Sequence, residues 1–263
     1  ANGRDTLEGA TAQPTAASAG DAIALNTEYK KRKLRWRSAD GRYSAGLQNR
    51  MQMRYSTPFD AGPRSLADLN ADGSSYDLRR IRTAFSGEIF DPALRFHIEH
   101  DWNETVIRDF FFNIDLNEHA TLWLGRGKAL YNMEFWLSSG RQQFVERNIS
   151  NGLFTLNRQQ GAQLYGRLFR DTPADLNYAL GVFTGRGGAE GSNDDDHLML
   201  TSRLQWNALG GDIEDAHGDL AFSPSPRLNL AVAGMRNRSD CTRFGSGAEG
   251  CRALPRFLSP ADA

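Results

Sequence analysis

The chain lacks a long apolar run. Hydrophobic residues make up 40% of its 263 residues and the mean hydropathy is −0.55. No stretch approaches the roughly 18 apolar residues of a membrane-spanning helix. A transmembrane β-barrel escapes this test, because half of each of its strands is polar. With a net charge of −1 and a pI near 6.6, the bulk charge predicts no nucleic-acid partner.

Lysine and cysteine are scarce. Four lysines stand beside 27 arginines. Arginine binds phosphate or carboxylate in two places and keeps its charge, although a high-GC genome would also favour its codons. The two cysteines, Cys241 and Cys251, lie in a Gly/Ser/Arg stretch. A disulfide that closes a surface loop in an oxidising compartment is the favoured interpretation, and two free thiols are the alternative.

The sequence also lacks a recognisable catalytic arrangement. Its five histidines show no metal-ligand spacing, and no Ser/His/Asp or paired-carboxylate pattern is evident. We therefore expect no enzyme activity, no cofactor and no metal. A soluble or barrel-embedded enzyme is the less favoured alternative, and a protein that is monodisperse without detergent would exclude the membrane barrel.

What the chain has is alternation over long segments. Three of them, 42–55, 76–90 and 93–102, carry polar and apolar side chains in turn. Because successive side chains of a strand point to opposite faces, each segment predicts one polar and one apolar face. Strands of about ten residues with this pattern are typical of an antiparallel transmembrane β-barrel with a polar lumen. The arginines predicted on the lumen face are Arg50, Arg54, Arg80, Arg82 and Arg95.

These arginines can bind anions from solution or pair with acidic residues on the same face, namely Glu88, Glu99 and Asp101. Both alternatives are open for each arginine. A few unpaired guanidinium groups would suffice to favour anions, because charges in a narrow low-dielectric channel are poorly screened. On the apolar side, aromatic residues are expected to contact lipid or other subunits. They are Trp102, Phe110, Phe112, Trp123 and Trp206.

Eleven strands are predicted along the chain. Asp40-Gly41 predicts a tight hairpin turn, Asp91-Pro92 a second turn, and Thr57–Ser74 a long loop. The predicted strands begin with one from Leu34 to about Trp36 and one that ends near Tyr55, and continue with 76–90, 93–102, Val106–Asp115, His119–Gly125, Gly161–Phe169, Leu176–Gly185, Leu198–Asn207, Gly218–Phe222 and Leu228–Met235.

The segment Arg126–Arg158 has no clean period of two. An insertion of this length at one place is usually functional or disordered. We expect it to fold inward and to place Arg141 or Arg147 near the narrowest point of a pore. Glu146 is expected to clamp the loop to the wall. Four aromatic residues would hold the loop there: Tyr131, Phe135, Trp136 and Phe144.

Six motifs together resemble the phosphate-selective porin family, porins O and P, from about Leu34 to Met235. They are Asp40–Arg50, Leu78–Glu88, Leu122–Lys128, Phe144–Asn148, Asn157–Gly166 and Tyr178–Gly185. The resemblance implies a 16-stranded barrel in the bacterial outer membrane, usually a trimer, whose third loop narrows the pore. It also implies contact with outer-membrane lipid and lipopolysaccharide, and small anions as solutes. Two departures are the scarcity of lysine and the absence of the last strands.

The sequence therefore predicts a flexible periplasmic leader at 1–33, barrel strands at 34–240 with a constriction loop at 126–158, and an extracellular loop or truncated end at 241–263. The chain begins at alanine, as a processed secretory product would. The function expected first is passive diffusion of small anions such as phosphate through an arginine-lined lumen. The alternative is a porin-like barrel that mainly anchors or supports an envelope complex.

Overall fold

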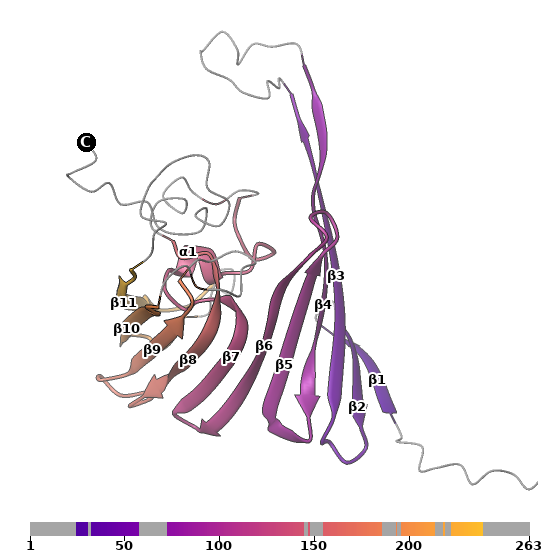
Figure 1. The fold of residues 1–263 in the computed structure, drawn as a ribbon. Helices are drawn as coiled ribbons and strands as arrows, with labels where there is room; N and C mark the ends of the chain where they lie inside the picture. Colours follow the sequence, from indigo (N-terminus) through magenta and orange to yellow (C-terminus); the bar gives the residue numbers. More distant parts are fainter. Residues whose placement is uncertain are drawn as a thin grey trace, which may run out of the picture.

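The part of the chain that the structure describes is all-β, with eleven antiparallel strands in one sheet (Figure 1). The computed structural model describes residues 25–30, 33–57, 73–144, 147, 155–185, 193, 196–213, 218 and 222–238. The strands are β1 (Leu25–Lys30), β2 (Lys33–Ser38), β3 (Ser44–Ser56), β4 (Ser75–Ile89), β5 (Asp91–Asp101), β6 (Val106–Asn117), β7 (Ala120–Lys128), β8 (Arg158–Leu168), β9 (Leu176–Phe183), β10 (Met199–Leu209) and β11 (Leu228–Arg236).

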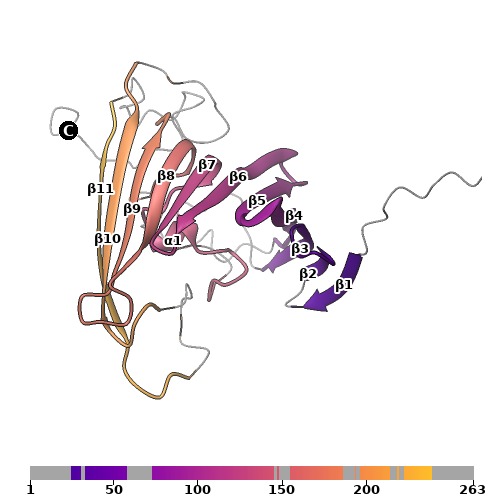
Figure 2. The same cartoon turned by 90° about the horizontal axis from the view of Figure 1, so that it is seen from below.

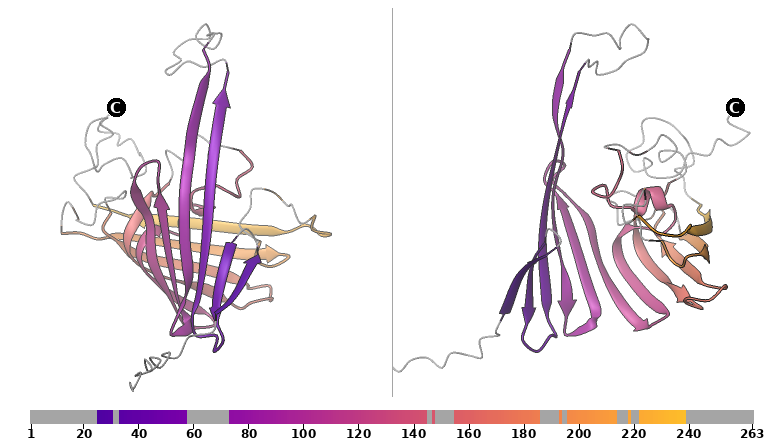
Figure 3. Two further views of the ribbon diagram at one scale, coloured as in Figure 1. Left: turned by 90° about the vertical axis from the view of Figure 1, so that its right-hand side faces the viewer. Right: turned by 180° about the vertical axis from the view of Figure 1, so that it is seen from behind.

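Each strand pairs with its neighbours in sequence, so the order in space is the order along the chain. The sheet curves into an open shell, and the short helix α1 (Met133–Trp136) lies inside the curve (Figure 2). β1 and β11 are its edges and do not pair with each other in the described part of the chain. The β3–β4 hairpin extends well beyond the neighbouring strands (Figure 3).

The strand register confirms the predicted separation of two faces. Arg50 lies directly opposite Arg82, and Arg82 lies opposite Asp101. The five arginines predicted to share a face do share it, and it is the concave face that holds α1. The apolar partners fall in the other rows of the same ladders: Leu47, Met51, Phe85, Leu94, Phe96, Phe110, Phe112, Leu200 and Leu204.

The distribution of polarity is the inverse of that in a soluble protein. Among the described residues, twelve buried side chains are polar or charged and only eight are hydrophobic. Large apolar side chains are instead exposed on the convex face, for example Met51 at 60%, Leu180 at 53% and Val232 at 69%. A soluble domain of this size would bury such residues, because each gains about 1.5–3 kcal/mol on leaving water.

The buried hydrophobic residues gather under the inserted loop, which spans 129–157 between β7 and β8. Trp123, Phe183 and Met199 extend from the concave face, and Ala129 and Leu156 meet them from the loop. The sequence predicted that Trp123 contacts lipid or another subunit. This is wrong, because Trp123 lies on the inner face and is only 7% exposed. The register explains the error, since Trp123 lies opposite Asn113 and Gln163 in the polar rows.

Three predicted boundaries need correction. Residues 25–30, expected in the leader, form β1, because Asn26–Tyr29 completes a hairpin with β2. The turn expected at Asp91-Pro92 is centred one residue earlier, at Phe90, which has a φ of 66°. The strand expected at Gly218–Phe222 is not seen at its two described ends, and residues 219–221 lie outside the described part. Cys241 and Cys251 also lie outside it.

Other local predictions are confirmed. Asp40-Gly41 forms the β2–β3 turn with Gly41 at a φ of 72°, and the link from β3 to β4 runs from residue 57 to 74 as expected. Three long links, β3–β4, β7–β8 and β9–β10, start and finish at one end of the sheet, whereas the long β10–β11 link starts and finishes at the other, because the strands alternate in direction. Within the described residues, no helix is long and apolar enough to cross a membrane.

Candidate functional site

The inserted loop and the concave face enclose a cavity of about 820 Å³, called the central cavity below. It extends from β2 to β8 and is closed on one side by residues 130–141 of the loop. Basic side chains outnumber acidic ones on its wall, six to two. The basic residues are Lys33, Arg35, Arg50, Arg82, Lys128 and Arg141, and the acidic ones are Glu99 and Asp109.

The loop is held against the wall through α1. Asn132 caps the helix by accepting a hydrogen bond from the Glu134 backbone N–H at 2.9 Å. Phe135 and Leu137 are buried beneath it. From the sheet, the Lys128 ammonium donates to the carbonyls of Trp136 and Leu137 at 3.4 and 3.3 Å. The described part of the loop thus folds inward, as predicted.

Arg147 binds other residues of the inserted loop. Its guanidinium donates to the carbonyls of Glu134, Phe135 and Leu137 at 2.9, 3.2 and 2.9 Å, and lies 5.2 Å from the centre of the Phe135 ring. Burial and the positive charge of Arg80 lower its pKa to about 10, so it stays charged at neutral pH. Arg147 clamps α1 rather than lining the central cavity. Glu146, the expected clamp, lies outside the described residues.

Of the four aromatic residues expected to hold the loop, three pack against the protein and one does not. Phe135 is buried and Trp136 is partly buried against the concave face. Tyr131 packs against the hydrophobic cluster under the loop. Phe144, in contrast, is 72% exposed and holds nothing, so this part of the prediction is wrong. The three aromatic residues that pack, Tyr131, Phe135 and Trp136, all lie in the first half of the loop.

Arg50 reaches from β3 to the tip of the loop. It donates to Ser139 Oγ at 2.8 Å and to Ser138 Oγ at 3.5 Å. Gly140 lies so close that a Cβ there would be 2.8 Å from Arg50 Nη1. Neither Arg50 nor Arg35 forms an ion pair with any described residue. Their charges are therefore not neutralised by a contacting carboxylate, and both face the central cavity.

Arg82, in contrast, is paired. Its guanidinium lies 3.1 Å from Glu99 and 2.9 Å from Asp101. Deeper in the wall, Arg158 binds Asp109 at 2.7 Å and Glu99 at 3.4 Å. Neighbouring ion pairs of this kind satisfy buried charges that would otherwise be costly to remove from water. This cluster is a structural part of the wall.

The remaining predicted arginines lie outside the central cavity. Arg54 pairs with Asp77 at 3.3 Å, and Arg80 donates to Gln52 at 2.8 Å and is only 7% exposed. Arg95 binds Asp115 and lines a neighbouring cavity of about 530 Å³. Of the seven arginines proposed from the sequence, the structure brings Arg50, Arg82 and Arg141 together at one cavity.

Sequence reasoning missed Lys33, Arg35 and Lys128 in this cavity. Lys33 and Arg35 alternate with Leu34 and Trp36, so a signal was available. Lys33 was instead predicted to lie in the leader, and Arg35 was placed in the first strand without being predicted to face the lumen. Lys128 carried no such signal. It is the last residue of β7, where only the return of the loop over the sheet brings its ammonium into the cavity.

The structure also gathers a group that could hold a cation. Ligand atoms of His97, Glu99 and Asp109 lie within 4.8 Å of one another. The sequence showed no such spacing, because Asp109 comes from the adjacent strand, β6. Arg158 donates to both carboxylate oxygens of Asp109, at 2.7 and 3.0 Å, and so supplies the positive charge a metal would bring. We therefore treat these residues as part of the ion-paired wall.

No family model and no curated protein matches the sequence of this chain. The resemblance to phosphate-selective porins thus stays a prediction, and the function must be argued from the geometry of the cavity.

Proposed function

We propose that this chain forms the wall and constriction of a bacterial outer-membrane pore through which small anions diffuse. One observation carries the proposal: a curved sheet with an apolar outer face encloses a cavity with six basic and two acidic side chains. In a barrel, lipid would cover the outer face and water would fill the inner one. The paired arginines would shape the wall, and Arg35, Arg50 and their neighbours would favour anions.

Phosphate suits these groups because a guanidinium binds its oxygens in two places. The sequence resemblance adds a trimeric assembly beside lipopolysaccharide to the proposal. Two lysines in the cavity, Lys33 and Lys128, compensate in part for the overall scarcity of lysine. The transport is passive, so the proposal assigns no catalytic residue to the chain.

A second candidate is a structural barrel that anchors or supports an envelope complex. It is favoured by the sheet edges at β1 and β11, which do not pair with each other in the described residues. An edge with free backbone groups offers a template for another strand. Such a protein would need lipid on its convex face but would conduct no ions.

Reversal potentials in planar bilayers test the proposal. The wild-type channel should prefer chloride over potassium at low salt. The R35Q/R50Q variant removes two cavity charges that lack a carboxylate partner, and should lower the preference roughly two- to fivefold, since each charge acts through a partly hydrated lumen. High salt should weaken the preference in both channels.

The matched control is R42Q/R227Q. Within the described part of the chain, Arg42 and Arg227 also lack carboxylate partners. Outside the central cavity, Arg42 donates to the backbone carbonyl of Phe90 and Arg227 to that of Gly210. This variant should keep the wild-type preference. A cation-selective wild-type channel would rule out anion diffusion, and a membrane-inserted protein without conductance would favour the structural alternative.

A further inference from the structure

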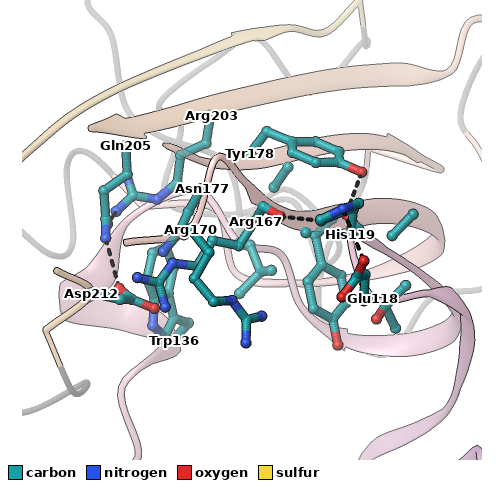
Figure 4. Close-up of a pocket in the computed structure, with 16 residues that line it drawn as sticks. Glu118, His119, Trp136, Arg167, Arg170, Asn177, Tyr178, Arg203, Gln205 and Asp212 are labelled. Atoms are coloured by element: carbon teal, nitrogen blue, oxygen red, sulfur yellow. Dashed lines mark hydrogen bonds and ion pairs between the residues drawn. The ribbon is translucent and has the colours of Figure 1, made fainter. Parts of the chain in front are cut away.

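A second cavity lies on the other side of α1. It has a volume of about 440 Å³ and reaches the turns that join β6 to β7 and β8 to β9, so it is called the turn-side cavity below. Figure 4 shows Trp136 near Arg170 and Asp212, with Tyr178 and His119 across the space. Like the central cavity, it has more basic than acidic side chains, with three arginines beside Glu118 and Asp212.

The two cavities share part of their lining. Leu130, Trp136 and Tyr165 border both. Leu130 is fixed by its backbone N–H, which donates to Gln163 at 3.2 Å, and Tyr165 donates to Asn113 at 3.2 Å. These three side chains therefore lie where the two cavities adjoin along the concave face.

Trp136 is the largest of the three and is held on two sides. The Arg203 guanidinium lies 4.6 Å from the centre of the Trp136 ring, and the backbone carbonyl of Trp136 accepts a hydrogen bond from Lys128. Its indole N–H, however, is buried and has no hydrogen-bond partner among the residues that the structure describes. An indole nitrogen can only donate, so the group that completes it must be an acceptor. A cation on the ring face strengthens the preference for an anion.

We propose that Trp136 is the partition between the two cavities, and that its indole N–H donates to a small oxyanion, such as a monocarboxylate, that passes there. The inference rests on the proposed function in that it places the partition on the solute path. An oxyanion at the partition gives up part of its hydration shell, and a buried N–H replaces one of the lost hydrogen bonds. Chloride, a weaker acceptor, gains less.

Two substitutions separate the ring from its N–H. W136F keeps an aromatic ring over Arg203 but has no donor. It should lower the formate-to-chloride permeability ratio about two- to fivefold, with chloride conductance close to wild type. W136A removes the ring and should raise the conductance of both ions. Unchanged conductance in W136A would overturn the partition, and an unchanged ratio in W136F would overturn the role of the N–H.

Trp102 provides the matched control. It lies in the β5–β6 turn, is 58% exposed, and its indole N–H already donates to Thr83 Oγ1 at 2.8 Å. W102F therefore removes an indole N–H without changing either cavity, and should leave the conductances and the permeability ratio at their wild-type values. A change of the ratio in W102F equal to that in W136F would mean that the effect does not come from the partition.

A readout independent of conduction distinguishes this inference from the proposed function. The protein is labelled with ¹⁵N-tryptophan in detergent micelles, and the Trp136 indole resonance is assigned as the one that is missing in W136F. Formate should shift this resonance and leave that of Trp102 unchanged. A shift without any wild-type current would support the anion site and reject diffusion through the pore. Current without a shift would support the pore and reject the site.

Discussion

The concave face of the sheet has two halves, and different interactions stabilise the side chains of each half. Over β3 to β6, its side chains are charged and form ion pairs such as Arg82 with Glu99 and Asp101. Over β7 to β10, the inserted loop covers the face, and Trp123, Phe183 and Met199 form an apolar cluster under it. The same alternation of inner and outer side chains therefore occurs in two environments. Where the inserted loop covers the sheet, the inner residues can be apolar, and elsewhere several are charged and paired.

The two halves meet at Arg158. It begins β8, at the end of the loop, and binds Asp109 of β6 at 2.7 Å while its own side chain is 7% exposed. It joins the charged half to the covered half. The comparison therefore predicts that a change here has the largest effect, and that changes within either half have smaller ones.

Arg158→Met should destabilise the protein most, by about 3–5 kcal/mol, because it leaves Asp109 buried without its cation. The measurement is urea-induced unfolding in detergent, followed by intrinsic fluorescence. The double variant R158M/D109L should recover much of the loss, since it removes both buried charges. A single variant as stable as the wild type would show that the two halves are not coupled through this ion pair.

Met199→Ala should have the next largest effect. Met199 is fully buried in the apolar cluster, and its truncation leaves a cavity under the loop at a cost of about 2–5 kcal/mol. Leu200→Ala is the control at the adjacent position, because Leu200 lies on the convex face and is 49% exposed. Equal losses in both variants, measured by the same unfolding assay, would contradict the division of the strand into a packed inner side and an exposed outer side.

Acid sensitivity tests whether charges also matter in the covered half. Hydrogen bonds from Arg167 hold the pKa of Asp175, in the β8–β9 turn, below its usual range. Because the pKa of Asp175 is lower in the folded than in the unfolded protein, its carboxylate stabilises the fold at pH values above the unfolded pKa of about 4. This stabilisation is lost as the pH falls below about 4.

Asp175→Asn should therefore lower the free energy of unfolding modestly, by about 1 kcal/mol at neutral pH, and flatten its dependence on pH below about 4. Unfolding curves at a series of acidic pH values measure both. Asp40→Asn, in the β2–β3 turn, changes an exposed carboxylate in the charged half and serves for comparison. A steeper acid loss in D175N than in the wild type would contradict this assignment.

Much of the fold could be predicted from single residues and their period. The arginines of β3, β4 and β5 lie on the face that alternation assigned to them, and Asp40-Gly41 turns the chain as its type requires. The site was predicted only in part. Arg50, Arg82 and Arg141 meet at the central cavity, whereas Arg147 turns to the carbonyls of α1 and Arg95 to another cavity.

The sequence by itself determined most of the strands, their order and the side of the sheet on which most of their side chains lie, because the period of two is a local property of extended backbone. Only the tertiary structure decided what lies above each side chain. The fold of the inserted loop over β7 to β10 buries Trp123, brings Lys128 into the cavity and places Trp136 between two cavities. These contacts join residues far apart in sequence, and no local pattern encodes which of them meet.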